Sequence, residues 1–547
     1  MKTIYKLLLA LVLSSTIISC SKFFEETSQN LAYVTSVDDL DELLVGDAYY
    51  YLTDDWTFSG SPFVTSASLT VWGYIYNYRM PFFINLMDDD ISEYALGANN
   101  MNNKNIQKWA AENNKHLHHW QKEPFTNYEE LIQEDVNWSI YYRRIGILNS
   151  VLHLVPEMRE KGEDPVKCDR VEGEARFLRA YYYMWLINCY ALPYDVSTAN
   201  TQLGVPLKTE PGIEDKYFER NTMKECYDQI RTDIHSAVSL LDKSEKLGTK
   251  RGTYTAAALL ASRVNLYSGE YKDAITYAEK AIKRGSHSLL NYNSMNFGES
   301  ITFLTSPETI FNQGRYFTTI TQHGIINVAS YYAPEPIPAS NGYKASDDLI
   351  ESFLDGDLRL KLGFSKSIIF PTFDVLFSRK VMNREDGEVA DCGTLRLPEA
   401  YLNKAEAEAI LGKTSEAIAT MAELHKTRFS SDNRPTLPTS EEELVNFIRN
   451  DRRCELHSEG HRWFDLRRYA VNAEYPKLTK IKHVHYTDKT ENGQYKIDGY
   501  YELDEYPNDK GAWVLPIPTK VLSFNKGNLK PNEDRKERQL IPTETVE

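Results

Sequence analysis

The sequence has little cysteine, and its basic residues are outnumbered by acidic ones. Six cysteines occur among 547 residues, and no two of them form a Cys-x-x-Cys pair. Five remain once Cys20 is assigned to the N-terminal segment described below, and an odd number of widely spaced thiols predicts neither a disulfide framework nor a zinc site. We expect these thiols to be buried and free. The formal net charge of −16 argues against nucleic acids and polyanionic substrates as partners.

Common catalytic motifs are also missing. The chain contains no Gly-x-Ser-x-Gly turn, no phosphate-binding glycine loop and no His-Glu-x-x-His pair. We therefore expect a binding protein that is not an enzyme and that needs no cofactor. A glycoside hydrolase stays open as an alternative, because two carboxylates at catalytic separation can arise by chance among 78 acidic residues. A helical scaffold that only contacts other proteins is a third alternative.

No metal site is predicted. His116, His118 and His119 lack the spacing of metal ligands on a regular helix or strand, and we expect them in a solvated loop. The acidic run 88–90 offers oxygen ligands that suit calcium, but its spacing is not that of an EF-hand loop.

The N-terminal residues have the pattern of a targeting segment. Lys2 and Lys6 precede an apolar run, 7–13, that is too short to span a bilayer. The run is followed by Ser19 and Cys20, which resembles a bacterial lipobox. We expect residues 1–19 to be a lipoprotein signal peptide, Cys20 to carry acyl chains such as palmitate, and residues 20–36 to be a flexible tether. An ordinary secretory signal with an incidental cysteine is the alternative.

Helical patterns begin directly after this tether. Ser36 is a candidate N-cap for a short helix over 37–44. Residues 127–160 predict one or two helices. Residues 169–190 predict another helix, which Pro193 prevents from continuing.

Two further segments, 258–285 and 401–428, share the spacing of small residues that is typical of tetratricopeptide helix pairs. Gly269, Ala274 and Ala278 in the first segment have the same spacing as Gly412, Ala417 and Met421 in the second. Small residues let two antiparallel helices approach closely, and each pair leaves one face uncovered. We therefore expect the pairs to stack into a short superhelix.

Aromatic residues are abundant, with 36 tyrosines, and many lie in two irregular regions at about 45–125 and 286–395. Tyr and Trp combine an apolar face with a polar tip, which suits a binding surface. The alternating aromatics at 72–78 predict an extended segment whose aromatic face contacts either a ligand or the core. The candidate ligand-binding residues are Trp72, Tyr74, Tyr76, Trp109, Trp120, Tyr331 and Tyr332.

Residues 447–469 form the most unusual stretch, because charges of alternating sign are mixed with aromatic residues. The spacing predicts a helix that is broken or tightly turned near Gly460. Charges three or four residues apart lie on one helical face, so they pair either in solvent or in a half-buried lattice. The aromatic neighbours and the planar fork of arginine favour the lattice. We expect its members to be Arg452, Glu455, Glu459, Arg462 and Asp465.

This stretch resembles the motif E-R-R-x-E-L-x-x-E-G-x-R-x-x-D-L-x-R of the SusD/RagB family of Bacteroidetes surface lipoproteins. Asp451 stands where the family usually has Glu. Residues 174–183 resemble a second family motif, E-A-x-F-L-R-A-x-x-Y, and residues 396–407 resemble a third, L-R-x-x-E-x-Y-L-x-x-A-E-A. Residues 513–525 resemble a C-terminal block, although Lys530-Pro531-Asn532 replaces the usual Q-N-P-G-Y.

The resemblance implies a mainly α, SusD-like fold with helix pairs in a short superhelix plus loop-rich and small β insertions. Residues 37–547 are expected to form a single domain, with helical parts at about 127–285 and 396–470. The implied protein is anchored by lipid to the extracellular face of the outer membrane, binds an oligosaccharide and delivers it as a lid to a TonB-dependent, SusC-like transporter. A peptide-binding member of the family is the alternative. The family's ligand residues lie in variable loops, so the candidate residues above depend only on aromatic placement.

Overall fold

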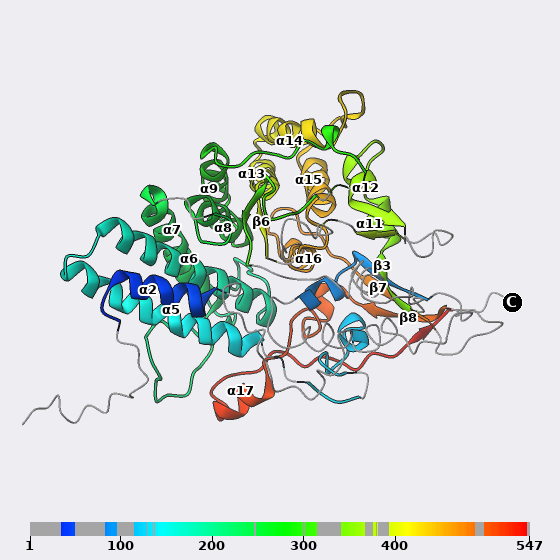
Figure 1. Ribbon diagram of the computed structural model, residues 1–547. Helices are drawn as coiled ribbons and strands as arrows, with labels where there is room; N and C mark the ends of the chain where they lie inside the picture. Colours follow the sequence, from blue (N-terminus) through cyan, green and yellow to red (C-terminus); the bar gives the residue numbers. More distant parts are fainter. Residues whose placement is uncertain are drawn as a thin grey trace, which may run out of the picture.

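The computed structural model shows a mainly helical protein with a smaller β-containing part (Figure 1). It describes residues 34–49, 82–95, 114–127, 130–133, 135, 137–244, 248–297, 299, 301–313, 341–366, 376–378, 380, 393–486 and 497–543. Among the described residues, no helix combines the length and the apolar character needed to cross a membrane.

Capping residues determine where the N-terminal helices begin. Ser36 and Asp39 form a capping box at the start of the first helix, and Thr222 and Glu225 form another at the start of α7. Asp164 caps α6, whose first residue is Pro165, a position that needs no N–H donor. The helices of this part are α2 (Val37–Leu43), the π-helical turn η2 (Leu44–Ala48), α5 (Asn137–Glu160), α6 (Pro165–Tyr190) and α7 (Met223–Leu240).

Two antiparallel helix pairs follow, as the repeat pattern predicts. They are α8 (Tyr254–Tyr267) with α9 (Tyr271–Lys283), and α13 (Leu397–Ile410) with α14 (Thr414–Arg428). Gly269 and Gly412 make the two turns at φ values of 78° and 72°, where a side chain would be strained. Helix α13 packs on α8 and α9, so the pairs are neighbours in space although they are far apart in sequence.

The charged stretch forms two helices joined by a tight turn. Helix α15 (Glu441–Leu456) ends before residues 457–461, and α16 (Arg462–Ala470) follows. Ser458 and Gly460 in the turn have positive φ values of 66° and 79°. The break predicted near Gly460 is therefore confirmed.

The strands are short and form small antiparallel sheets. Strand β1 (Ile91–Ala95) pairs with β3 (Asn341–Ala345), from Ile91 opposite Ala345 to Ala95 opposite Asn341. The other described pairs are β2 (Thr309–Phe311) with β6 (Leu395–Arg396), β4 (Phe364–Lys366) with β5 (Leu376–Ser378), and β7 (Ile481–Tyr486) with β8 (Ile497–Leu503) and β9 (Ile541–Pro542). Single-turn and short helices complete the framework: η3 (Phe82–Leu86), η4 (Leu241–Lys243), η5 (Tyr292–Ser294), α11 (Asp347–Glu351), α12 (Leu358–Gly363), η6 (Ser431–Asn433), η7 (Tyr506–Asn508) and α17 (Thr519–Phe524).

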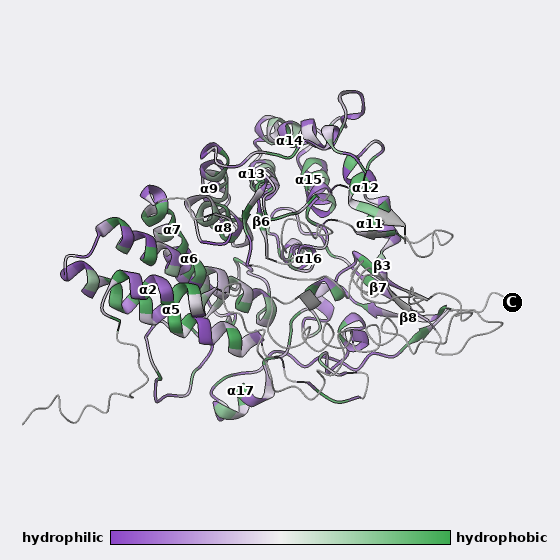
Figure 2. Ribbon diagram, in the orientation of Figure 1, coloured by the Kyte–Doolittle hydropathy of each residue, from purple (hydrophilic) through white to green (hydrophobic). Residues whose placement is uncertain are grey.

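The largest apolar core extends from Val37 near the N-terminus to Leu529 near the C-terminus. Helix α6 lies at its centre, and every residue from Phe177 to Ala191 is buried. Helices at the outer edge, such as α5 and α7, alternate between hydrophilic and hydrophobic residues along their turns (Figure 2). This alternation is expected of helices that place one face on the core.

One detail of the sequence-based prediction needs correction. The helix expected within 127–160 begins only at Asn137, and Thr126 pairs with Ile132 in a β-bridge ahead of it. Asn532, which lies in the replaced part of the C-terminal block, makes side-chain hydrogen bonds to three other residues. Arg220 Nη1 donates to Asn532 Oδ1 at 2.8 Å, and Asn532 Nδ2 donates to the carbonyls of Tyr190 and Leu515 at 3.0 and 2.8 Å.

Two helical glycines predict opposite effects of the same substitution. A Cβ at Gly173 in α6 would lie 2.8 Å from Leu241 Cγ, whereas a Cβ at Gly146 in α5 would meet nothing within 4 Å. Gly173→Ala should therefore lower the free energy of unfolding by about 1–3 kcal/mol through overpacking. Gly146→Ala should raise it by about 0.5–1 kcal/mol through helix propensity. Urea denaturation of both variants measures the difference, and the same sign for both would contradict the packing described here.

Candidate functional site

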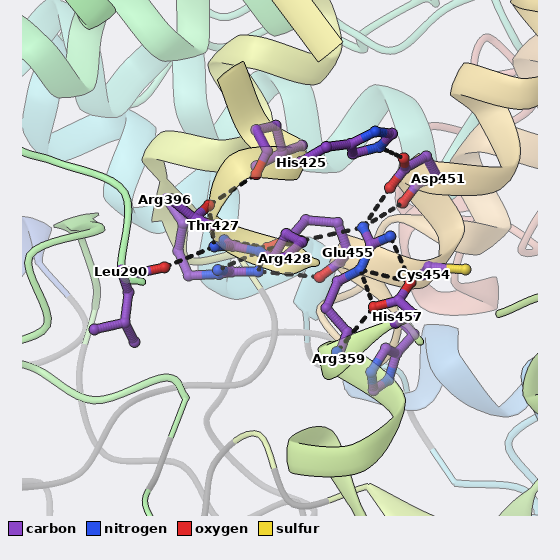
Figure 3. Close-up of polar contacts among 12 residues, drawn as sticks. Leu290, Arg359, Arg396, His425, Thr427, Arg428, Asp451, Cys454, Glu455 and His457 are labelled. Atoms are coloured by element: carbon purple, nitrogen blue, oxygen red, sulfur yellow. Dashed lines mark hydrogen bonds and ion pairs between the residues drawn. The ribbon is translucent and has the colours of Figure 1, made fainter. Parts of the chain in front are cut away.

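A buried network of ion pairs surrounds Glu455, on the last turn of α15 (Figure 3). Arg428 from α14 contacts both carboxylate oxygens of Glu455, at 2.9 and 3.0 Å. Arg396 and Arg359 lie 3.4 Å from the same carboxylate. Arg428 is 0% exposed and Glu455 is 1% exposed, so these charges depend on one another rather than on water.

Two more carboxylates complete this network. Glu308 pairs with Arg396 at 3.0 Å and with Arg428 at 2.7 Å. Glu459 pairs with Arg396 at 2.7 Å and with Lys380 at 2.8 Å. Lys380 also donates to the carbonyls of Glu455 and His457. The network therefore joins segments that lie more than a hundred residues apart in sequence.

A second group of buried ion pairs lies between α15, α16 and α13. Arg452 pairs with Asp465 at 2.8 Å and donates to Asn403 Oδ1 at 2.7 Å. Arg468 bridges Asp465 and Glu406, with contacts of 2.7 Å to each. Burial raises the pKa of Glu406, but the guanidinium of Arg468 outweighs burial and lowers it to about 2.

A third group connects α15 and α16 to the acidic run just before β1. Arg462 binds both oxygens of Asp89, at 2.6 and 2.7 Å, and Arg453 binds Asp90 at 2.7 Å. Ser346, just after β3, donates through its N–H and its hydroxyl to the carbonyls of Asp90 and Asp89. The base of the β1–β3 ladder is therefore attached to the helical frame by charge and by hydrogen bonds.

The predicted lattice exists, but its pairing pattern was predicted incorrectly. Only Arg452 and Asp465 pair with each other among the five expected members. Arg462 pairs with Asp89 and Glu455 pairs with three arginines from other elements, whereas the helical spacing favoured neighbours within 452–465. Glu455, Glu459 and Arg452 are buried, not half-buried. Since all five carry a charged partner, we interpret them as structural residues and not as a catalytic centre.

The histidines and the tryptophan of the segment 116–120 lie differently from the prediction. His118 and His119 are buried rather than solvated. Trp120 is also fully buried, its indole N–H donates to the carbonyl of Met87 at 2.9 Å, and its ring stacks on His483 at 4.2 Å. Its assignment as a ligand platform is therefore corrected: Trp120 is a core residue.

The other candidate residues lie outside the described part of the chain: Cys20, Trp72, Tyr74, Tyr76, Trp109, Tyr331 and Tyr332. The described residues nevertheless show where two of the aromatic-rich segments start. Ala95, after which the chain runs toward Trp109, lies opposite Asn341, before which the chain carries Tyr331 and Tyr332. The described residues next to the two segments are therefore cross-strand neighbours in one two-stranded sheet.

A separate groove lies between residues 122–135 and the C-terminal loops 511–520 and 531–535. It has a volume of about 370 Å³. Phe125, Ile132 and Ile517 supply apolar surface, and Ile132 is 67% exposed. Lys122 and Glu533 are among its polar groups. The mixture of apolar surface and polar groups suits an organic ligand of moderate size. The C-terminal block gave a sequence signal for this region, but residues 122–135 gave none.

Two family models match the chain. Residues 82–266 match a model described as "Starch-binding associating with outer membrane", and residues 374–533 match the model of the SusD family. A SusD-like protein of Formosa agariphila is 25% identical over 382 residues, which cover 61% of this chain and 72% of that protein.

Solved structures with the same fold cover nearly the whole chain. A sugar-binding protein of Bacteroides vulgatus, so described provisionally, aligns with a TM-score of 0.63 at 22% identity and covers 92% of this chain and 100% of its own. A SusD superfamily protein of Bacteroides thetaiotaomicron aligns with a TM-score of 0.62 at 19% identity, over 91% of this chain and 100% of its own. At these identities the alignments show the fold alone.

The network predicts a large loss of stability when Glu455 is neutralised. Glu455→Gln removes the shared partner of Arg359, Arg396 and Arg428 while it keeps the side-chain volume. Breaking a buried ion pair costs on the order of 3–5 kcal/mol because the remaining charge is uncompensated. The free energy of unfolding from guanidinium denaturation should fall by that amount.

The matched control is Glu423→Gln, which removes an exposed pair with Lys426 three residues away. Exposed pairs contribute about 0–1 kcal/mol. Equal, small effects of the two substitutions would show that the charges around Glu455 are solvated and that the network is not a structural centre.

Proposed function

The chain belongs to the SusD/RagB family, and from this we propose that it binds an oligosaccharide or a related nutrient at the cell surface and passes it to a TonB-dependent transporter. The family is associated with the outer membrane and with glycan binding. Lipid attachment at Cys20 and the position on the extracellular face are parts of the same proposal. The proposal includes binding without turnover.

The antiparallel pairing of Ala95 with Asn341 is the observation that carries the binding proposal. The last described residue before one aromatic-rich segment and the first described residue after the other are therefore neighbours. These segments contain Trp109, Tyr331 and Tyr332, and aromatic rings can stack on the apolar C–H faces of sugars. Arg462 and Arg453 hold the base of this ladder through Asp89 and Asp90, so ligand-binding loops would start from a rigid support.

Binding is tested by calorimetric titration of the purified full-length protein in detergent. We expect a starch fragment such as maltoheptaose, or another oligosaccharide of a neutral panel, to bind without released product. An alanine series at Trp72, Tyr74, Tyr76, Trp109, Tyr331 and Tyr332 should show one or two positions with losses of about 2 kcal/mol or more. The aromatic control is Phe297→Ala, because Phe297 is 62% exposed. A buried core residue such as Trp138 in α5 would not serve, because its replacement would change stability as well.

Three results would contradict this part of the proposal in different ways. Uniformly small losses across the series would place the site elsewhere, with the groove around Phe125 and Ile517 as the next location to test. Binding of peptides in preference to sugars would favour the peptide-binding alternative. Released sugar product would show a glycoside hydrolase.

The transporter partner is proposed because a surface-anchored binding protein must pass its ligand to a separate channel. The described residues include an exposed aromatic pair, Tyr217 and Phe524, which contact each other with ring centroids 6.4 Å apart. Phe524 is 70% exposed, and Asn525 accepts a hydrogen bond from the N–H of Phe218 at 2.7 Å, so the pair lies on a fixed surface. Exposed apolar groups on a fixed surface favour protein contact.

Purification through a C-terminal tag in mild detergent should recover a much larger outer-membrane transporter together with this protein. Phe524→Ser should reduce that recovery, whereas Val196→Ser, at another exposed apolar residue, should leave it unchanged. Recovery of this protein alone, under conditions that preserve other outer-membrane complexes, would contradict the lid model. If the Phe524→Ser variant recovers as much transporter as the wild type, the transporter is still a partner, but it does not contact this surface.

A further inference from the structure

Three side chains that can bind a metal lie close together, one from β1, one from β7 and one from the segment 114–119. Glu93 lies in the middle of β1, His485 lies near the end of β7, and His119 follows a helical turn. Each offers one ligand atom, and the three atoms lie within 4.8 Å of one another. His485 Nδ1 is 3.5 Å from Glu93 Oε2. The three residues are far apart in sequence, so no spacing rule could have identified them.

His119 supplies a second, independent observation. It is only 4% exposed, and its Nε2 has no hydrogen-bond partner among the described residues. Its ring stacks on Tyr501 with centroids 4.1 Å apart and planes 20° apart, which limits rotation of the imidazole. Leaving a buried polar nitrogen without a partner costs free energy, and a bound cation would remove that cost.

The donor set is that of a transition metal rather than of calcium. Imidazole nitrogens suit zinc and its neighbours, whereas calcium takes six to eight oxygen ligands. The acidic run considered for calcium is engaged otherwise, because Asp89 and Asp90 pair with Arg462 and Arg453. Because Asp89 and Asp90 already have charged partners, the His119 cluster is the better metal-binding candidate among the described residues.

The three ligand atoms, which lie within 4.8 Å of one another, must move closer together for one ion to bind all of them. Zinc binds imidazole nitrogen and carboxylate oxygen at about 2.0–2.2 Å, so tetrahedral ligand atoms lie about 3.3 Å apart. The Glu93–His485 distance of 3.5 Å already meets this requirement. The side chain of His485 is 26% exposed, which leaves a route for the ion and room for water as a fourth ligand.

We propose that Glu93, His119 and His485 form a binding site for one divalent transition-metal cation, with zinc as the ion that best fits the donors. The cation links β1 to β7 and to the segment 114–119. Because β1 pairs with β3, the cation also stabilises this two-stranded ladder, which ends at the pair Ala95 and Asn341. The site does not depend on the ligand or the transporter proposed above.

The test uses metal-free, full-length protein in detergent and zinc chloride as the probe. Calorimetry should show one zinc per chain, and the thermal unfolding midpoint should rise with zinc concentration. His119→Asn and His485→Asn should each weaken zinc binding by about 100-fold or more, since even loss of an outer-shell contact costs roughly 10- to 100-fold. His116→Asn is the matched control, because His116 lies three residues away and contacts Glu130 instead.

A third variant and a second measurement keep the test decisive if a histidine variant folds poorly. Glu93→Gln preserves the side-chain shape, and it should weaken zinc binding while circular dichroism without zinc stays at the wild-type level. Crystals soaked in zinc chloride should show an anomalous peak between the three side chains. Absence of stoichiometric binding, wild-type affinity in the His119 and His485 variants, or anomalous peaks only elsewhere would overturn the proposal.

Discussion

The pairing of buried arginines with buried carboxylates is the interaction on which the rest of the structure depends. Removing two charges from water is expensive, and the cost is recovered only when each charge meets an opposite charge in good geometry. Around Glu455 this condition is met by Arg359, Arg396 and Arg428, which belong to three different elements. A shift of any one element would leave a charge uncompensated, so the network fixes how the elements are placed.

This constraint connects the helical frame to the irregular part of the protein. The helix pairs α8–α9 and α13–α14 are held by apolar packing between small residues, together with the buried ion pair of Arg263 in α8 and Glu399 in α13. The segments around β1, β3 and β5 contribute buried residues such as Ile91, Tyr343 and Ala345 to the apolar clusters. They are also attached by charge, through Asp89 and Asp90 to the arginines of the charged stretch and through Lys380 to Glu459. The frame supplies rigidity, and charge pairing transmits it to the base of the β1–β3 ladder.

Sequence reasoning predicted what depends on local chemistry. The capping residue Ser36 and the break near Gly460 follow from backbone preferences of single residues, and the small-residue spacing that includes Gly269 and Gly412 predicted the helix pairs. The family motifs, which are long and specific, extended this to the overall fold.

Long-range contacts could not be predicted in the same way. Helical spacing favoured partners for Arg462 within the charged stretch, but its partner Asp89 lies 373 residues away. The segment that contains His119 and Trp120 is polar and reads as a surface loop. The two side chains are buried because β7 and β8 pack against this segment. The cluster of Glu93, His119 and His485 likewise appears only when two separate strands are brought together.

The central claim is that charge pairing between α16 and the acidic run holds the base of the β1–β3 ladder. Amide hydrogen exchange, followed by mass spectrometry in the wild type and in Arg462→Ala, tests it most directly. The account predicts faster exchange for peptides covering 88–95 and 341–346, with unchanged protection in α8 and α9, because the loss is local to the attachment. Wild-type protection of 88–95 and 341–346 in the variant would contradict the claim and show that the ladder is held by other contacts.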